Sequence, residues 1–329
     1  MRSIILPLLL ALFAPAASAA EQIITETAAV ASPAVAPIPT LLDGAILGLV
    51  EGITEFLPIS STGHLIIASG ALGLDSTAPV QVPGLDESVE FKQATDAFIV
   101  IIQIGAIAAV AIIYWRRVLR ILAGLVGRDP EGLRLAINIV IACIPAGVLG
   151  LIFGDLIDTY LFSINAVIFA LVAGALLMFW VEARRKKLPA NTSFTGSGAP
   201  TTLENLRPAQ ALLIGGMQCF ALWPGTSRSM VTIVGGYLAG LPPALAAEFS
   251  FLVGLPLLSA AAALKTYKHA PEVLAAYDLG PIVVGLLVAA GSAAIAVRFL
   301  VGFLTRHGLG AFAWYRLALA AVLLGATIL

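Results

Sequence analysis

Charged and hydroxyl side chains gather in two short stretches of an otherwise very apolar chain. The first stretch runs from Glu51 to His64 (EGITEFLPISSTGH), and the second from Pro224 to Thr232 (PGTSRSMVT). Hydrocarbon tolerates carboxylates, an imidazole and a guanidinium only where tight pairing or function retains them. The sequence therefore predicts that the two stretches form one site.

Two carboxylates open the first stretch. Glu51 and Glu55 are four residues apart, so a helix would place both on one face, about 6 Å apart along its axis. Like charges at this spacing persist if a divalent cation or a guanidinium lies between them, or if one carboxylate keeps its proton. The alternative is a pair of carboxylates that faces water at the mouth of a helix.

Hydroxyl groups and a histidine follow the predicted break at Pro58. Ser60, Ser61 and Thr62 stand at the start of a new helix, whose free N–H groups and dipole favour an anion such as phosphate. His64 could act as a nucleophile or as a general acid and base near neutral pH. A buried histidine with a purely structural role is the alternative.

The second stretch repeats this design. Gly225 allows a ligand to approach the backbone, while hydroxyl donors come from Ser227, Ser229 and Thr232. Arg228 supplies a planar fork of donors that fits two phosphate oxygens at once. The alternative for Arg228 is an internal salt bridge with one of the two glutamates.

The other polar groups at membrane depth are expected to have lesser roles. Arg298 and Arg316 lie nearer predicted helix ends, where a long side chain can extend to the interface. We expect Gln103, Gln218 and Glu248 to support the substrate or the metal, with a structural role as the alternative. Cys143 and Cys219 lack the spacing of metal ligands and are expected to be small buried apolar residues.

Composition places the chain among polytopic membrane proteins. Of its 329 residues, 60% are hydrophobic and only 11% are charged, and its mean hydropathy is +1.01. Soluble domains carry about 25% charged residues. The net charge of -1 provides no basic field for nucleic acid, so nucleic-acid binding is excluded.

Apolar stretches long enough to cross a bilayer predict an all-α membrane fold. Six stretches are expected to span: 97–115, 135–153, 164–181, 245–264, 282–300 and 311–329. The stretches 41–72 and 209–241 are broken in the middle by proline and polar residues. Because a broken helix needs its freed backbone groups satisfied by protein, we interpret these two as re-entrant helical hairpins.

The N-terminus has the pattern of a secretory signal peptide. Arg2 precedes an apolar run, and small residues end at Ala19. We expect cleavage after Ala19, which makes 1–19 a signal peptide and 20–40 a flexible linker before the membrane domain at 41–329. An uncleaved N-terminal helix is the alternative.

Basic residues predict the orientation in the membrane. They cluster at 116–134, at 184–187 and around 298–306, whereas the alternate connections are richer in acids. Because cytoplasmic loops carry the excess of lysine and arginine, the mature N-terminus is expected outside.

A weak internal repeat relates the two halves. The GLVE that ends at Glu51 parallels the GGMQ that ends at Gln218, and counting to Pro58 and Pro224 gives one residue fewer in the second copy. Each copy, 41–182 and 207–329, is a broken helix followed by three spans. An odd number of spans inverts the second copy, so the two hairpins would enter from opposite faces and meet near the midplane.

These motifs resemble those of a known family. The pattern Glu51-x-x-x-Glu55 with PxSSTGH ending at His64, followed by ALWPGTSRSxxT with its arginine at Arg228, is similar to that of the bacterial undecaprenyl-diphosphate phosphatases of the bacitracin-resistance type. The likeness covers nearly the whole chain from residue 41 onward. The departures are the signal-like N-terminal extension and the loop from Lys186 to Thr202, and both lie outside the motifs.

The resemblance implies hydrolysis of a C55 polyprenyl diphosphate to the monophosphate carrier lipid and inorganic phosphate, for cell-wall synthesis and bacitracin resistance. It implies a divalent cation (Mg²⁺ or Ca²⁺) held by Glu51 and Glu55, phosphoryl-transfer roles for Ser61 and His64, and a phosphate clamp at Arg228. It further implies the inner membrane of a bacterium, with the site open to the periplasm. Ser61, Ser227, His64 and an activated water all stay open as the nucleophile.

Two rival classes are compatible with parts of the pattern. Inverted repeats with broken helices also describe transporters, so transport or lipid flipping without hydrolysis is the main alternative. The acid-phosphatase-like lipid phosphatases require a second histidine downstream of a Ser-Arg pair, and none follows Ser229 before His269. For partners we expect the lipid substrate, and a homodimer stays open.

Overall fold

Helices form nearly the whole of the part of this protein that the structure describes. The computed structural model describes residues 36–83, 88–161, 163–187 and 202–328. The predicted signal peptide and most of the linker lie outside these residues. The α-helices within them are α3 (Leu41–Thr54), α4 (Ser61–Ala71), α5 (Phe91–Ile113), α6 (Trp115–Leu125), α7 (Pro130–Leu161), α8 (Ile164–Lys187), α9 (Pro208–Gln218), α10 (Arg228–Leu238), α11 (Pro243–Ala276), α12 (Leu279–His307) and α13 (Gly310–Ile328).

The remaining elements are short. Two 3₁₀ turns, η1 (Leu203–Asn205) and η2 (Cys219–Leu222), flank α9. Strands β1 (Pro79–Gln81) and β2 (Ser88–Glu90) pair antiparallel, with Val80 opposite Val89. This small ribbon lies in the connection that precedes α5 and leaves the predicted all-α class unchanged.

Among the described residues, five helices are long and apolar enough to cross a membrane: α5, residues 130–154 of α7, α8, α11 and α12. Each contains one of the predicted spans, except that α5 ends two residues before the predicted span 97–115 does. The sixth prediction falls on α13, whose apolar part, Gly310–Gly325, is shorter. The helices also extend beyond the apolar windows: α7 continues to Leu161 and α11 to Ala276, through stretches that the sequence predicted as connections.

Both broken helices are present, and the backbone shows that they are built alike. After each break the new helix begins with a serine in the left-handed region, Ser60 at φ 77° and Ser227 at φ 73°. Each serine side chain accepts a hydrogen bond from the third N–H of its helix, at Gly63 and at Met230, both 3.3 Å. Such a side-chain bond satisfies one of the N–H groups that a helix start leaves without a carbonyl.

The caps show that the two breaks have equal length. Nine positions separate Glu51 from Ser60, and nine separate Gln218 from Ser227. Counted to the prolines, the second copy has one residue fewer, because proline stands at a different place within each break.

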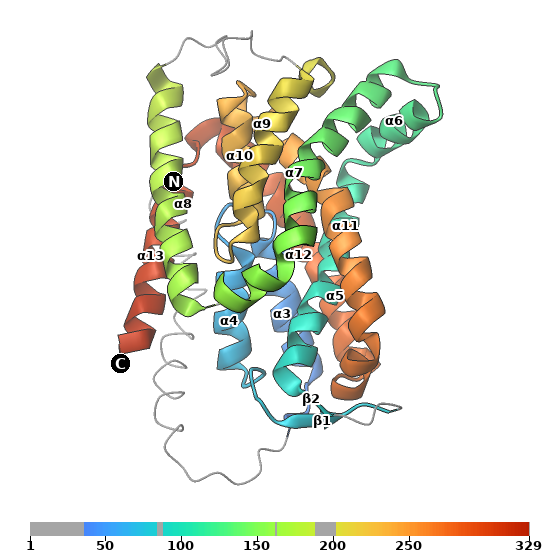
Figure 1. Ribbon diagram of the computed structural model, residues 1–329, viewed down its shortest axis with the longest axis vertical. Helices are drawn as coiled ribbons and strands as arrows, with labels where there is room; N and C mark the ends of the chain where they lie inside the picture. The colour runs from blue at the N-terminus through green and yellow to red at the C-terminus, as the bar shows by residue number, and fades with distance from the viewer. Residues whose placement is uncertain (1–35, 84–87, 162, 188–201, 329) are drawn as a thin grey trace.

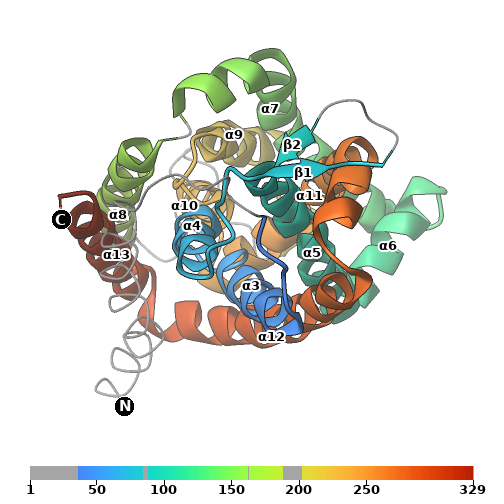
Figure 2. The ribbon, with the colours of Figure 1, turned by 90° about the horizontal axis from the view of Figure 1, so that it is seen from below.

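Each broken helix packs against a long helix from the other half of the chain. The α3 helix packs against α12, and α9 packs against α7. Glycines permit both contacts, because a Cβ at Gly48 would meet the carbonyl of Gly285, and one at Gly215 would meet the backbone of Ala142. Figure 1 shows α3 and α4 in the lower half and α9 and α10 in the upper half, while Figure 2 shows α3, α4 and α10 surrounded by the longer helices.

A charged network ties α6 to the end of the molecule opposite β1 and β2. Arg117 forms ion pairs with Glu204 and Glu248, and Arg120 pairs with Asp129 at 3.0 Å. The backbone N–H of Gly132 and the Arg120 guanidinium hold the pKa of Asp129 below its usual range. The predicted basic clusters on α6 and at the end of α8 thus lie at the same, upper end in Figure 1.

Candidate functional site

An ion pair between the two broken helices lies at the centre of the site. Arg228 donates from Nη2 to Oε1 of Glu55 at 3.0 Å, and Ser61 donates from Oγ to the other carboxylate oxygen at 2.9 Å. The Arg228 and Glu55 side chains are only 9% and 7% exposed. The alternative of an internal salt bridge for Arg228 is therefore observed, and it joins the two predicted stretches.

Equivalent positions of the two halves supply these partners. Ser61 is the first residue of α4, and Arg228 is the first residue of α10. Because the caps Ser60 and Ser227 turn the backbone in the same way, both first residues reach the same carboxylate on Glu55. The two similarly built helix starts thus present different side chains, a hydroxyl and a guanidinium, to one carboxylate.

A glycine makes room for the Arg228 guanidinium. Its Nη1 donates to the carbonyl of Ser250 on α11 at 3.0 Å, and a Cβ at Gly254 would lie 2.7 Å from that nitrogen. Gly254 is one turn beyond Ser250, so a side chain there would block this carbonyl. The guanidinium also stands 5.4 Å from the ring centre of Phe56, within the range of a cation–π contact.

Two buried polar atoms beside this pair lack partners within the described residues. One is Oε1 of Glu51, a residue that is 1% exposed, and the other is Nε of Arg228. Glu51 has Glu55 and Arg228 as charged neighbours and Gln103 as a hydrogen-bonding neighbour. Unsatisfied buried groups of opposite character are costly unless a ligand completes them.

The carboxylate set suits a hard cation. Glu51 and Glu55 offer oxygen ligands, and Gln103 is an amide close to Glu51. In the described residues no group of three or more histidine, cysteine or acidic side chains forms a metal cluster. Two carboxylates with phosphate oxygens and water are the ligands that Mg²⁺ usually takes, so the residues present fit such an ion.

Most of the remaining hydroxyl groups form hydrogen bonds around the second break. Ser227 and Ser229 lie 3.0 Å apart, and Ser229 donates to the carbonyl of Leu57 in the first break at 2.8 Å. Thr232 lies 2.6 Å from the Ser250 hydroxyl. Thr62 follows Ser61 and is half-buried, whereas Gly225, at φ 89°, is buried against Val167. Ser227, Ser229 and Thr232 thus lie in hydrogen bonds around the start of α10.

His64 lies in a separate hydrogen-bonded cluster. Its Nδ1 is 2.6 Å from the carbonyl of Ser60, and its Nε2 is 2.7 Å from the Tyr315 hydroxyl. The imidazole is 4% exposed and stacks parallel to the Tyr315 ring. Both ring nitrogens thus face α13 and the Ser60 cap, and neither is bonded to Glu55 or Arg228.

Two other predicted residues stand apart from the ion pair. Glu248 binds Arg117 at 2.8 Å in the charged network of α6. Gln218, the counterpart of Glu51 in the second half, donates to the carbonyl of Ala142 at 3.1 Å. The structure thus places both in contacts between helices.

Arg316 corrects an expectation from sequence. It does not extend to the interface, because its side chain is fully buried. Its guanidinium donates to the carbonyls of Leu171, Ala170 and Gly225. A Cβ at Gly174 would collide with it, so this glycine makes room for Arg316 as Gly254 does for Arg228. Sequence reasoning missed both glycines, since a glycine on an apolar helix carries no chemical signal.

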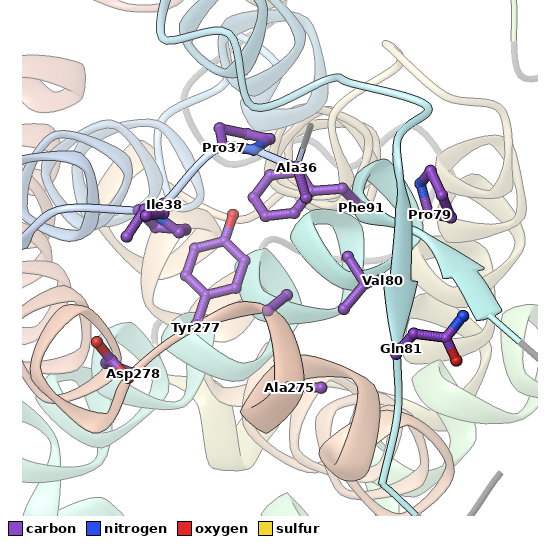
Figure 3. Close-up of a pocket in the computed structure, with 12 residues that line it drawn as sticks. Ala36, Pro37, Ile38, Pro79, Val80, Gln81, Phe91, Ala275, Tyr277 and Asp278 are labelled. Atoms are coloured by element: carbon purple, nitrogen blue, oxygen red, sulfur yellow. The ribbon is translucent and has the colours of Figure 1, made fainter. Parts of the chain in front are cut away.

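A cavity of about 380 Å³ lies at the lower end of the molecule, away from the ion pair. Figure 3 shows Phe91, Tyr277 and Val80 around it, and none of the predicted site residues lines it. The functional site is therefore assigned from its buried charges, because this cavity offers no cation to a phosphate.

Comparison with known proteins identifies the family of this chain. The model of the family "Bacitracin resistance protein BacA" matches residues 44–322. The chain belongs to this family. An undecaprenyl-diphosphatase of Sorangium cellulosum is 41% identical, with 86% of this chain and 85% of the relative covered. Undecaprenyl-diphosphatase 2 of Rhodospirillum rubrum is 44% identical over 86% of this chain and 94% of its own.

A third BacA-family relative agrees with these two. Undecaprenyl-diphosphatase 1 of Chromobacterium violaceum is 41% identical over 87% of this chain and 96% of its own length. The region matched by the BacA family model contains both breaks and every predicted site residue. The resemblance seen in the sequence motifs is confirmed.

Proposed function

We propose that this protein hydrolyses undecaprenyl diphosphate to undecaprenyl phosphate and inorganic phosphate, which returns the carrier lipid to cell-wall synthesis. Family membership and the names of the relatives support this activity. The observation that carries it is the Arg228–Glu55–Ser61 contact, flanked by an unsatisfied Glu51 oxygen and an unsatisfied Arg228 nitrogen. A diphosphate could accept from the Arg228 nitrogen, and a cation bound with it could satisfy the Glu51 oxygen.

Arg228 would bind the diphosphate together with the two helix starts. Its Nε still has a hydrogen to donate, and the first turns of α4 and α10 present N–H groups of positive dipole character. Thr62, Ser227, Ser229 and the Gly225 backbone line the same breaks. Phosphoryl transfer depends mostly on such positioning and charge stabilisation.

Ser61 has the best geometry among the candidate nucleophiles. Its hydroxyl already donates to Glu55, as a nucleophile donates to its base. In the proposed step, Ser61 Oγ bonds to the terminal phosphorus and its proton passes to Glu55. The bond from that phosphorus to the bridging oxygen breaks, and prenyl monophosphate leaves. Water then releases phosphate from the serine.

Glu51 and Glu55 would hold a divalent cation, Mg²⁺ or Ca²⁺. When bound, the cation would supply positive charge to the non-bridging phosphate oxygens. The unsatisfied Oε1 of Glu51 supports this role, and Gln103 would orient the Glu51 carboxyl.

For the membrane arrangement we propose six spans, with α13 as the sixth, and two re-entrant hairpins in an inverted repeat. The matching caps at Ser60 and Ser227 and the exchanged packing of α3 and α9 support the repeat. The basic clusters on α6 and α8 would face the cytoplasm of a bacterial inner membrane. The hairpin of α3 and α4 would then open to the periplasm.

Phosphate release from a long-chain prenyl diphosphate tests the activity. The purified protein should release phosphate in the presence of Mg²⁺ or Ca²⁺, and this release should stop when a chelator is added. Arg228→Lys keeps the charge but loses the fork, and it should lower kcat by about 100-fold. Glu51→Gln should weaken activation by the metal.

The site, the phosphatase activity and the nucleophile would each be contradicted by a different outcome. Near wild-type turnover in Arg228→Lys and Glu51→Gln would refute the site. A folded protein that moves the lipid between leaflets without hydrolysis at any metal concentration would refute the phosphatase assignment. Acid-quenched reactions should contain a phosphoryl group on Ser61 by mass spectrometry, and full activity in Ser61→Ala would exclude this nucleophile.

A further inference from the structure

Two consecutive residues of α13 reach the two broken helices. The Tyr315 hydroxyl is 2.7 Å from His64 Nε2 on α4, while Arg316 donates to the carbonyl of Gly225, just before α10, at 3.1 Å. One helix from the end of the chain is thus hydrogen-bonded to both breaks.

The link to the first break passes through the His64 ring. A carbonyl oxygen only accepts, so His64 Nδ1 must donate to Ser60, which is the N-cap of α4. In a neutral imidazole Nε2 is then an acceptor, and the Tyr315 hydroxyl donates to it. Tyr315 therefore holds the cap residue of α4 through one rigid ring.

The link to the second break is the buried guanidinium of Arg316, which donates hydrogen bonds to backbone carbonyls. Arg316 is 0% exposed, and its recorded partners are the carbonyls of Ala170, Leu171 and Gly225. A buried cation without a carboxylate is expensive to keep. Gly174 leaves the space that it occupies on α8. Such a residue is retained where its geometry matters.

We propose that Tyr315 and Arg316 are positioning residues that fix the starts of α4 and α10 relative to each other, so that Ser61 and Arg228 meet Glu55 together. This inference rests on the proposed function for its kinetic test. It also gives His64 a positioning role in place of the nucleophile or general-base role.

Kinetics of α13 variants test the proposal. Tyr315→Phe removes only the hydroxyl and should lower kcat by about tenfold, and Arg316→Met should lower it by about 100-fold, as expected when reacting groups are misplaced. KM should change less than about twofold in both, because neither residue is among those proposed to bind the diphosphate. Trp314→Phe, on the exposed side of α13, is the control and should match wild type.

Two further variants test which contacts carry the effects of Tyr315 and Arg316. In a His64→Ala background, Tyr315→Phe should cost nothing more, because its effect passes through the imidazole. Gly174→Ala would displace the Arg316 guanidinium from α8 without changing charge, and it should lower kcat by about tenfold. Gly147→Ala, where a Cβ meets open space, is its control. Gly174→Ala and Arg316→Lys replace Arg316→Met if that variant does not fold.

Hydrogen exchange separates this inference from the proposed activity. The first turns of α4 and α10 should exchange faster in Tyr315→Phe and Arg316→Met than in wild type or Trp314→Phe. Wild-type exchange and wild-type kcat in both variants would overturn the proposal. Absence of phosphate release from the wild-type protein would refute the proposed function alone, since the exchange comparison would still decide whether α13 positions the breaks.

Discussion

At the scale of single residues, this site depends on two buried arginines that bind helical carbonyls. Arg228 reaches the carbonyl of Ser250 because Gly254 has no side chain, and Arg316 reaches that of Ala170 because of Gly174. In each case the glycine stands one turn after the carbonyl. The rigid fork of arginine keeps its direction in such a contact, whereas a lysine would not.

Gly254→Ala tests this arrangement at Arg228. The new Cβ would lie 2.7 Å from Nη1, so the guanidinium must shift, and we expect phosphate release to fall at least about tenfold. Gly291→Ala on α12 is the matched control, because a Cβ there meets nothing. It should keep full activity and gain about 0.5–1 kcal/mol of stability. Equal activity in the two variants would show that the position of Nη1 is unimportant.

At the scale of elements, the breaks combine strain with capping. Ser60 and Ser227 hold positive φ angles, a region that costs a residue other than glycine about 1–2 kcal/mol. Both serines nevertheless cap the helices that follow. A serine with positive φ stands at both breaks, although glycine would relieve the strain. This indicates that the serine hydroxyl is needed at these positions.

Ser227→Gly should separate stability from activity. Glycine removes the strain and loses only a few tenths of a kcal/mol as a cap, so the unfolding free energy should rise by about 1 kcal/mol. Ser227→Ala keeps the strain without the cap and should lose about 1 kcal/mol. Both should release phosphate more slowly than wild type. Thermal unfolding in detergent measures the first effect, and a destabilised glycine variant would contradict the strain argument.

At the scale of the whole molecule, the two halves complete each other. The carboxylates come from the first half and the arginine from the second, and each broken helix packs against a long helix of the other half. The α5 and α11 helices also pack together, as do α8 and α13. Neither half contains the full site, so we expect each half to be inactive alone.

Cysteine labelling tests the proposed orientation. In a background without Cys143 and Cys219, Gln81→Cys on the exposed β1 strand should react with a membrane-impermeant maleimide in intact cells. Arg128→Cys, at the exposed turn between α6 and α7, should react only after permeabilisation. The reverse pattern would place the basic clusters outside and refute the orientation.

The sequence by itself determined the helical membrane class, the two breaks and the residue types of the site. Apolar length indicates spans, and prolines with polar neighbours mark breaks, because these signals are local along the chain. Local signals also identified Glu55, Ser61 and Arg228 as candidates. They misplaced Arg316, since its distance from a helix end carries no information about which helices surround it.

Only the tertiary structure decided which of these residues meet. It joined Arg228 to the same carboxylate as Ser61, placed His64 against Tyr315, and moved Glu248 into the network of α6. It also showed that Gly174 and Gly254 shape the site. These outcomes depend on contacts between residues far apart in the chain, where the absence of one Cβ decides whether a guanidinium can reach a carbonyl.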